Sequence, residues 1–164
     1  MGLTGPAQRG NRMRLLVIDG QGGGVGKSLI AAVKRLAPEQ AVIAAGTNAQ
    51  ATAAMLRAGA DLGATGESAI RYQCRHADVI AGVTGILHAN AMLGEISPAI
   101  AAAVSLSEAQ KVLVPLERCG LRIAGVGKQP LDSLIREAAR MICALCGYPV
   151  DLSLIHISEP TRPY

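Results

Sequence analysis

The stretch LLVIDGQGGGVGKSLIAAV, residues 15 to 33, decides the fold class of this chain. It passes from an apolar run into a loop with five glycines between positions 20 and 26, and then into a segment with apolar residues at helical spacing. A continuous apolar run without polar alternation is typical of a strand buried on both faces of a parallel sheet. The stretch therefore predicts a strand, a tight glycine turn and a helix, which together begin an α/β fold.

The same unit repeats along the chain, with four further strands and several helices. We expect the strands at 41–45, 61–65, 78–83 and 111–116, and the helices at 26–36, 49–59, 67–77 and 130–146. After the fourth strand we expect a helical region broken at Gly94 and restarted at Pro98, with Ser97 as its N-cap. We expect residues 121–126 to form an antiparallel edge strand. Right-handed crossovers then give a doubly wound three-layer sandwich, an α/β fold with a mostly parallel, five- to six-stranded Rossmann-like sheet of order 3-2-1-4-5.

The 164 residues suffice for one domain, which we place at residues 13–150. Residues 1–12 are rich in glycine and polar residues, and we expect them to form a disordered lead. Residues 151–164 do not continue the pattern, and SLIHISEPTRPY resembles the translated adapter remnants found at the ends of assembled sequence reads. We therefore interpret residues 151–164 as a non-native tail.

Composition argues against several classes of partner. The chain has three Tyr but neither Phe nor Trp, so it lacks the aromatic platforms that stack on single-stranded nucleic acid. Its net charge of +4 is not gathered on one segment, which also argues against nucleic-acid binding. No apolar segment is long enough for a secretory signal or a membrane span. We expect a cytoplasmic protein that binds neither nucleic acid nor membrane.

The four cysteines include a CxxC pair, Cys143 and Cys146, which raises the question of redox or metal chemistry. The pair lies near the end of an expected apolar helix, and no second pair or His stands at zinc spacing. We therefore expect reduced thiols that pack as small apolar side chains, and no metal site.

The glycine loop, DGQGGGVGKS at 19–28, admits three interpretations, of which the first is an ATPase phosphate loop. That loop needs a glycine where this chain has Gln21. GGVGKS is similar to the second half of the deviant loop of partitioning-type ATPases, but their signature lysine is replaced here by Gly22. An Asp that could hold Mg²⁺ at the end of another strand is also missing. A partitioning-type ATP-binding protein stays an alternative.

The second interpretation is a dinucleotide site. Gly20, Gly24 and Gly26 match the spacing G-x-x-x-G-x-G, and VIDGQGGGVGKS resembles the loop of short-chain dehydrogenases. Gly20 would permit a sharp exit from the strand, Gly24 would let a pyrophosphate approach the backbone, and Gly26 would let the helix pack closely on the sheet. The helix N-terminus would supply free N–H groups to the phosphates. NAD or NADP is the cofactor that this interpretation predicts.

The hydride-transfer chemistry of that family is not predicted, because no Tyr-x-x-x-Lys pair is present: Tyr72 is followed by His76. A small NAD(P)-dependent oxidoreductase that uses other strand-end residues stays an alternative.

The third interpretation is a purely structural glycine corner, although five glycines cost more conformational entropy than a corner requires.

Other small and polar residues follow the expected strands and should meet at the same edge of the sheet. His88 and Glu95, seven residues apart, would share one face of a helix and could orient an acid–base pair. AQATAAMLRAG at 49–59 could form the face of a homodimer, although burial on the sheet explains it more simply. The predicted cofactor-binding residues are Gly20, Gln21, Gly22, Gly23, Gly24, Val25, Gly26, Lys27, Ser28, Gly46, Thr47, Asn48, Thr84 and Gly85.

Four stretches, VIDGQGGGVGKS, GTNAQATAAMLRAGADLGATGES, HANAMLGEISP and KVLVPLERC, resemble those of an uncharacterised bacterial family known as a domain of unknown function. The resemblance covers residues 13 to about 146. It implies a short, single-domain, Rossmann-like protein of the cytoplasm with nucleotide-binding architecture. It implies no substrate and no reaction, so a nucleotide-binding protein that acts as a sensor or accessory subunit is our main hypothesis.

Overall fold

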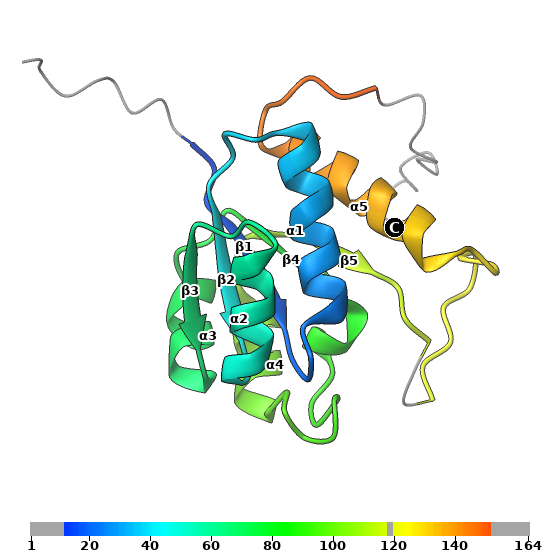
Figure 1. The fold of residues 1–164 in the computed structure, drawn as a ribbon. Helices are drawn as coiled ribbons and strands as arrows, with labels where there is room; N and C mark the ends of the chain where they lie inside the picture. The colour runs from blue at the N-terminus through cyan, green and yellow to red at the C-terminus, as the bar shows by residue number, and fades with distance from the viewer. Residues whose placement is uncertain (1–11, 118–119, 152–164) are drawn as a thin grey trace, which may run out of the picture.

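The computed structural model describes residues 12–117 and 120–151. Five parallel strands form one sheet in the order β3-β2-β1-β4-β5, as predicted (Figure 1). The strands are β1 (Leu15–Asp19), β2 (Val42–Gly46), β3 (Leu62–Thr65), β4 (Val79–Val83) and β5 (Gln110–Val114). Nearly all of the expected disordered lead, Arg118, Cys119 and all but the first residue of the expected non-native tail lie outside the described residues.

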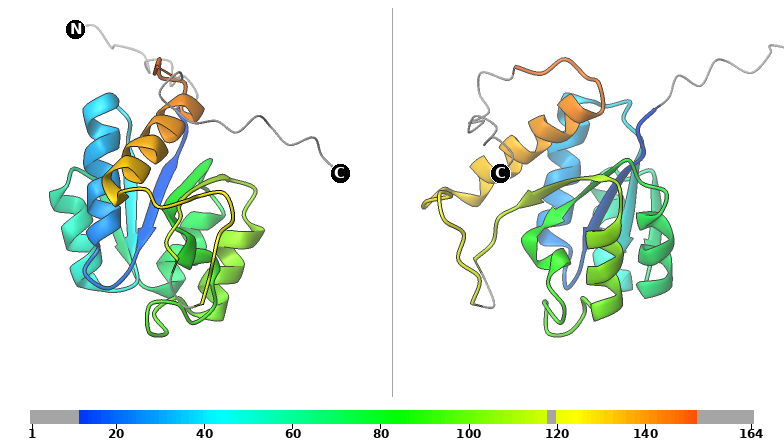
Figure 2. Two further views of the ribbon diagram at one scale, coloured as in Figure 1. Left: turned by 90° about the vertical axis from the view of Figure 1, so that its right-hand side faces the viewer. Right: turned by 180° about the vertical axis from the view of Figure 1, so that it is seen from behind.

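Helices cover both faces of the sheet. One face carries α1 (Gly24–Leu36), α2 (Ala49–Arg57) and α5 (Leu131–Leu145), and the other carries α3 (Glu67–Cys74) and α4 (Pro98–Leu106) (Figures 1 and 2). The three-layer α/β sandwich is therefore confirmed. No helix in the described ranges is long and apolar enough to cross a bilayer.

The central strands are apolar because both of their faces are covered. Every residue of β1 and β4 is buried, whereas edge strand β3 is mostly exposed. The side chains between the sheet and the helices are mainly Ala, Val, Ile and Leu, which allows the helices to approach the sheet closely. On α2, Ala51, Ala54 and Met55 are buried, so the Ala-rich face of this helix packs against the sheet.

Two local predictions are wrong. The region after β4 is not a helix beyond the short 3₁₀ turn η1 (Thr84–Leu87), because Asn90, Met92 and Leu93 all have positive φ and cannot continue one. His88 and Glu95 therefore do not share a helix face. The restart is confirmed: Ser97 caps α4 by accepting a hydrogen bond from the Ile100 N–H at 3.2 Å.

The sixth, antiparallel edge strand is also absent from residues 121–126. Gly125 and Gly127 have φ values of 86° and 64°, which turn the chain away from extended geometry. The Ile123 N–H donates to the Glu117 carboxylate at 3.1 Å instead of to a neighbouring strand. The sheet therefore ends at β5 on this side.

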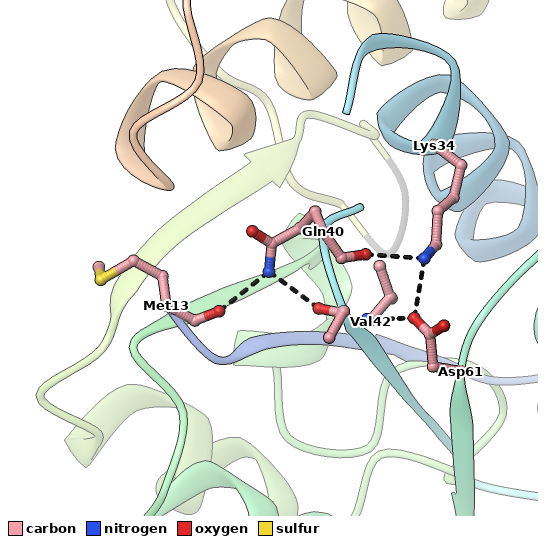
Figure 3. Close-up of polar contacts among 6 residues, drawn as sticks. Met13, Lys34, Gln40, Val42 and Asp61 are labelled. Atoms are coloured by element: carbon pink, nitrogen blue, oxygen red, sulfur yellow. Dashed lines mark hydrogen bonds and ion pairs between the residues drawn. The ribbon is translucent and has the colours of Figure 1, made fainter. Parts of the chain in front are cut away.

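Polar contacts join the amino ends of the strands, opposite the glycine loop (Figure 3). Lys34 on α1 donates from Nζ to the Gln40 carbonyl at 2.7 Å and pairs with Asp61 at 2.8 Å. Asp61 also accepts from the Val42 N–H at 2.8 Å, and the buried Gln40 amide donates to the Met13 carbonyl at 2.9 Å. These contacts tie α1 to the starts of the sheet's central and edge strands.

Replacing Lys34 by methionine is expected to destabilise the chain by up to about 1 kcal/mol, because the Asp61 carboxylate is half-exposed. The hydrogen bond from Lys34 holds the pKa of Asp61 below its usual value. This stabilisation is present above the ordinary Asp pKa and is lost as the pH falls through the lower, folded-state pKa. Urea unfolding between pH 6 and 3 should show a smaller acid loss in Lys34→Met than in the control Lys128→Met. Equal acid losses in the two variants would contradict this role.

Candidate functional site

The glycine loop is a tight turn between β1 and α1. The Gly23 N–H donates to the Gly20 carbonyl at 2.9 Å, and Gln21 and Gly23 have φ values of 50° and 70°. Gly23 caps α1, and a Cβ there would lie 2.9 Å from the Ala51 carbonyl oxygen. Both the left-handed backbone and the lack of space require glycine at this position.

Two further glycines are required by packing. A Cβ on Gly20 would lie 2.7 Å from the Thr47 hydroxyl and 2.8 Å from the Met92 sulfur. A Cβ on Gly26 would lie 2.7 Å from the Met55 sulfur and 2.9 Å from the Asp19 Cβ. Gly20 and Gly26 thus let the loop and helix α1 sit directly against their neighbours, and a structural corner explains both of them.

Gly22 and Gly24 are different. A Cβ on either glycine would meet no atom within 4 Å, and neither residue has a left-handed φ. The fold itself would therefore accept a side chain at both positions. Neither backbone strain nor crowding explains these two glycines.

Gly22 and Gly24 both line a cavity of about 390 Å³ at the carboxyl ends of the strands. The cavity lies between the loops after β1 and β4, where the strand order reverses, and open α/β sheets bind ligands at such a point. Its volume lies in the range of small-molecule sites. Its lining residues are Asp19, Gly20, Gln21, Gly22, Gly24, Val25, Val83, Thr84, Gly85, His88, Ala91, Met92, Leu93, Leu116 and Leu121.

Asp19, the last residue of β1, holds the two ends of the loop together. Its side chain is buried, and its two oxygens accept hydrogen bonds at 2.7 Å from the N–H groups of Gly20 and Gly26. Burial raises the pKa of this carboxyl, and nearby Glu95 raises it further. Asp19 was not among the predicted binding residues, although a charged residue at the end of an apolar run was a usable signal.

Glu95 was expected on a helix with His88 but instead contacts the loops after β1 and β2. Its Oε2 accepts from the Gln21 N–H at 2.9 Å. Its Oε1 accepts from Thr47 Oγ1 at 3.1 Å and from Asn48 Nδ2 at 2.6 Å. Asn48 also donates to the Gln21 carbonyl at 3.0 Å and caps α2 through its Oδ1. The polar groups of Thr47 and Asn48 therefore engage Glu95.

The structure separates the predicted binding residues into two sets. Those that line the cavity are Gly20, Gln21, Gly22, Gly24, Val25, Thr84 and Gly85. Those that do not line it are Gly23, Gly26, Lys27, Ser28, Gly46, Thr47 and Asn48. Lys27 is exposed, and the Ser28 hydroxyl donates to the Gly24 carbonyl at 3.0 Å.

Thr84, directly after β4, links one side of the cavity to the segment after β5. Its hydroxyl exchanges hydrogen bonds of 3.2 Å with the N–H and the carbonyl of Leu116 in the segment after β5. Leu116 itself lines the cavity, as does His88. The side of the cavity that follows β4 and β5 is mostly apolar, and His88 adds an imidazole to it.

The three cysteines that the structure describes do not line this cavity. Cys74, Cys143 and Cys146 are free thiols, and burial raises the pKa of Cys74 and Cys146 to about 11. A raised pKa keeps a thiol protonated and poorly reactive. Within the described residues, no cluster of three or more His, Cys, Asp or Glu side chains could hold a metal ion.

The family described as Domain of unknown function (DUF3842) matches residues 14–146, which is most of the chain. The chain belongs to this family. No curated protein and no solved structure matches it.

Proposed function

We propose that this protein binds a nucleotide, with a phosphate of the ligand resting on the backbone of Gly22, Gly24 and Val25. The observation that carries the proposal is the pair of glycines on the cavity wall whose side-chain positions are open and unstrained. A ligand that approaches the backbone needs such positions to stay free of a Cβ. The structural-corner interpretation leaves both glycines unexplained.

Hydrogen-bond donors support the same placement. The first N–H groups of an α-helix have no partner inside the helix. In α1 the Gly26 N–H donates to the carboxylate of Asp19. The N–H groups of Gly24 and Val25 are the remaining donors of the first turn. The positive end of the dipole of this helix favours an anion at these donors.

We propose NAD or NADP as the nucleotide. Beyond the glycines, the cavity wall is largely apolar, with Val83, Ala91, Leu116 and Leu121, and an apolar wall suits a flat ring. Lys27, which an ATP-binding loop would direct at the phosphates, is exposed and does not line the cavity. We also propose a reducing compartment such as the cytoplasm, which the three free cysteines among the described residues support.

A thermal-shift panel tests the proposal. The panel contains NAD, NADH, NADP, NADPH, ATP with Mg²⁺, and GTP. A ligand that binds only the folded chain raises its melting temperature, and at 100 times its Kd the gain in stability is about 2.7 kcal/mol. We expect a nicotinamide dinucleotide to give the largest shift. A shift with ATP and Mg²⁺ alone would overturn the dinucleotide assignment, and no shift with any compound would favour a structural corner.

A further inference from the structure

The three hydrogen bonds to Glu95 come from uncharged donors on two different loops. They are the Gln21 N–H after β1 at 2.9 Å, the Thr47 hydroxyl after β2 at 3.1 Å and the Asn48 side-chain amide at 2.6 Å. Among the described residues, no Lys, Arg or His pairs with Glu95. The hydrogen bonds to this carboxylate therefore come from uncharged donors alone.

One of these donors, Gln21, adjoins the proposed phosphate position, and Asn48 donates to the Gln21 carbonyl at 3.0 Å. Gln21 donates to Glu95 and also lines the cavity beside Gly22. Neutral backbone and side-chain donors at the carboxyl ends of parallel strands are the groups that bind ligand phosphates in open α/β sheets. Gln21, Thr47 and Asn48 thus form a second anion position, called here the Glu95 seat.

The segment that delivers Glu95 has an unfavourable backbone. In residues 88–95, called here the strap, three non-glycine residues adopt left-handed φ values: 66° at Asn90, 56° at Met92 and 57° at Leu93. Leu93 is 98% exposed, so burial of its side chain does not offset this conformation. The strap joins η1 to α4 at the carboxyl ends of the strands (Figure 1). Backbone hydrogen bonds of this segment, including the one from the Asn90 N–H to the Ile96 carbonyl at 2.7 Å, and the contacts of Glu95 hold the strap in place.

We propose that Glu95 is an internal competitor, which occupies the Glu95 seat until an acidic group of the ligand replaces it and the strap moves away. This inference rests on the proposed nucleotide-binding function and adds its regulation. A ligand with two linked phosphates can use the glycine loop and the seat together, whereas a monophosphate can use only one. The ligand class is therefore a nucleotide that carries a diphosphate.

The test compares Glu95→Ala and Glu95→Gln with the wild type and with Glu39→Gln. Glu39 is an exposed carboxylate for which the described part of the chain shows no hydrogen bond or ion pair, so its variant controls for the change in net charge. Glu95→Gln keeps an acceptor for Thr47 or Asn48 and guards against loss of the fold in Glu95→Ala. The probes are inorganic pyrophosphate and NAD, and binding is followed by NMR at the Gln21 amide.

We expect pyrophosphate to bind Glu95→Ala about 10-fold or more tightly than the wild type, since hydrogen bonds to a charged group are worth at least that factor. Glu95→Gln should lie between them, and Glu39→Gln should match the wild type. Equal or weaker pyrophosphate binding by both Glu95 variants would overturn the inference. If the Glu95 variants bind pyrophosphate more tightly, but neither they nor the wild type bind NAD or any nucleotide of the thermal-shift panel, the seat stands and the proposed function fails. If NAD binds the wild type and the Glu95 variants equally, the function stands and the inference fails.

Discussion

Gly24→Val is expected to weaken nucleotide binding by about 100-fold or more while the chain keeps its fold. The valine side chain would fill the space through which a phosphate reaches the Gly24 and Val25 amides. Two hydrogen bonds to a charged phosphate, at about 1.5–3 kcal/mol each, correspond to at least that loss in affinity. Because a Cβ on Gly24 meets no atom within 4 Å, the free energy of unfolding should change little. Isothermal titration calorimetry and urea unfolding measure the two quantities.

Gly26→Ala is the matched control for this experiment. Its methyl group would press on the Met55 sulfur and the Asp19 side chain, so we expect a loss of about 1–3 kcal/mol in stability. The two variants therefore separate a glycine kept for a ligand from a glycine kept for packing. A Gly24→Val chain that binds the nucleotide as tightly as the wild type would place the ligand elsewhere.

Asp19→Ala is expected to destabilise the chain by about 2–4 kcal/mol. The substitution leaves the N–H groups of Gly20 and Gly26 without their acceptors in a buried environment, and each such group costs about 1–3 kcal/mol. Water entering from the adjoining cavity would offset part of this cost. Urea unfolding at neutral pH measures the effect, and a loss below about 0.5 kcal/mol would show that Asp19 does not hold the loop.

The pH dependence of Asp19 has the opposite sign to that of Asp61. Because burial raises the pKa of Asp19, its folded form binds a proton more tightly than the unfolded chain does. Its contribution to stability is therefore greatest below the ordinary Asp pKa and declines as the pH rises through the higher, folded-state pKa. Asp19→Asn should remove this decline, and a decline equal to that of the wild type would assign it to another group.

The sheet order could be predicted from sequence because its cause is local. Apolar runs such as LLVI and VIAGV report burial on both faces, and short crossovers leave few arrangements of parallel strands. The position of the glycine loop at the strand ends follows from the same pattern. The roles of Gly22 and Gly24 could not be separated from those of Gly20, Gly23 and Gly26, because the difference lies in which neighbours each glycine faces.

The surroundings of the loop depend on contacts between distant residues. Glu95 meets Gln21 across 74 positions of sequence, and the left-handed residues Asn90 and Met92 that bring it there follow no periodic pattern. Thr47 and Asn48 were selected from their position after a strand, but their contact with Glu95 was not. Asp19 ends an apolar strand, which marks it in the sequence, but its role depends on the amide of Gly26, seven residues further on.

An NMR titration with NAD tests the central claim most directly. With ¹⁵N-labelled protein, the account predicts saturable shifts that are largest at the amides of Gly22, Gly24 and Val25, and these shifts should be absent in Gly24→Val. NADP serves as the second titrant. The absence of saturable shifts with either dinucleotide, or largest shifts in the groove between α3 and α4 near Arg71 and Arg75, would contradict a phosphate site on the glycine loop.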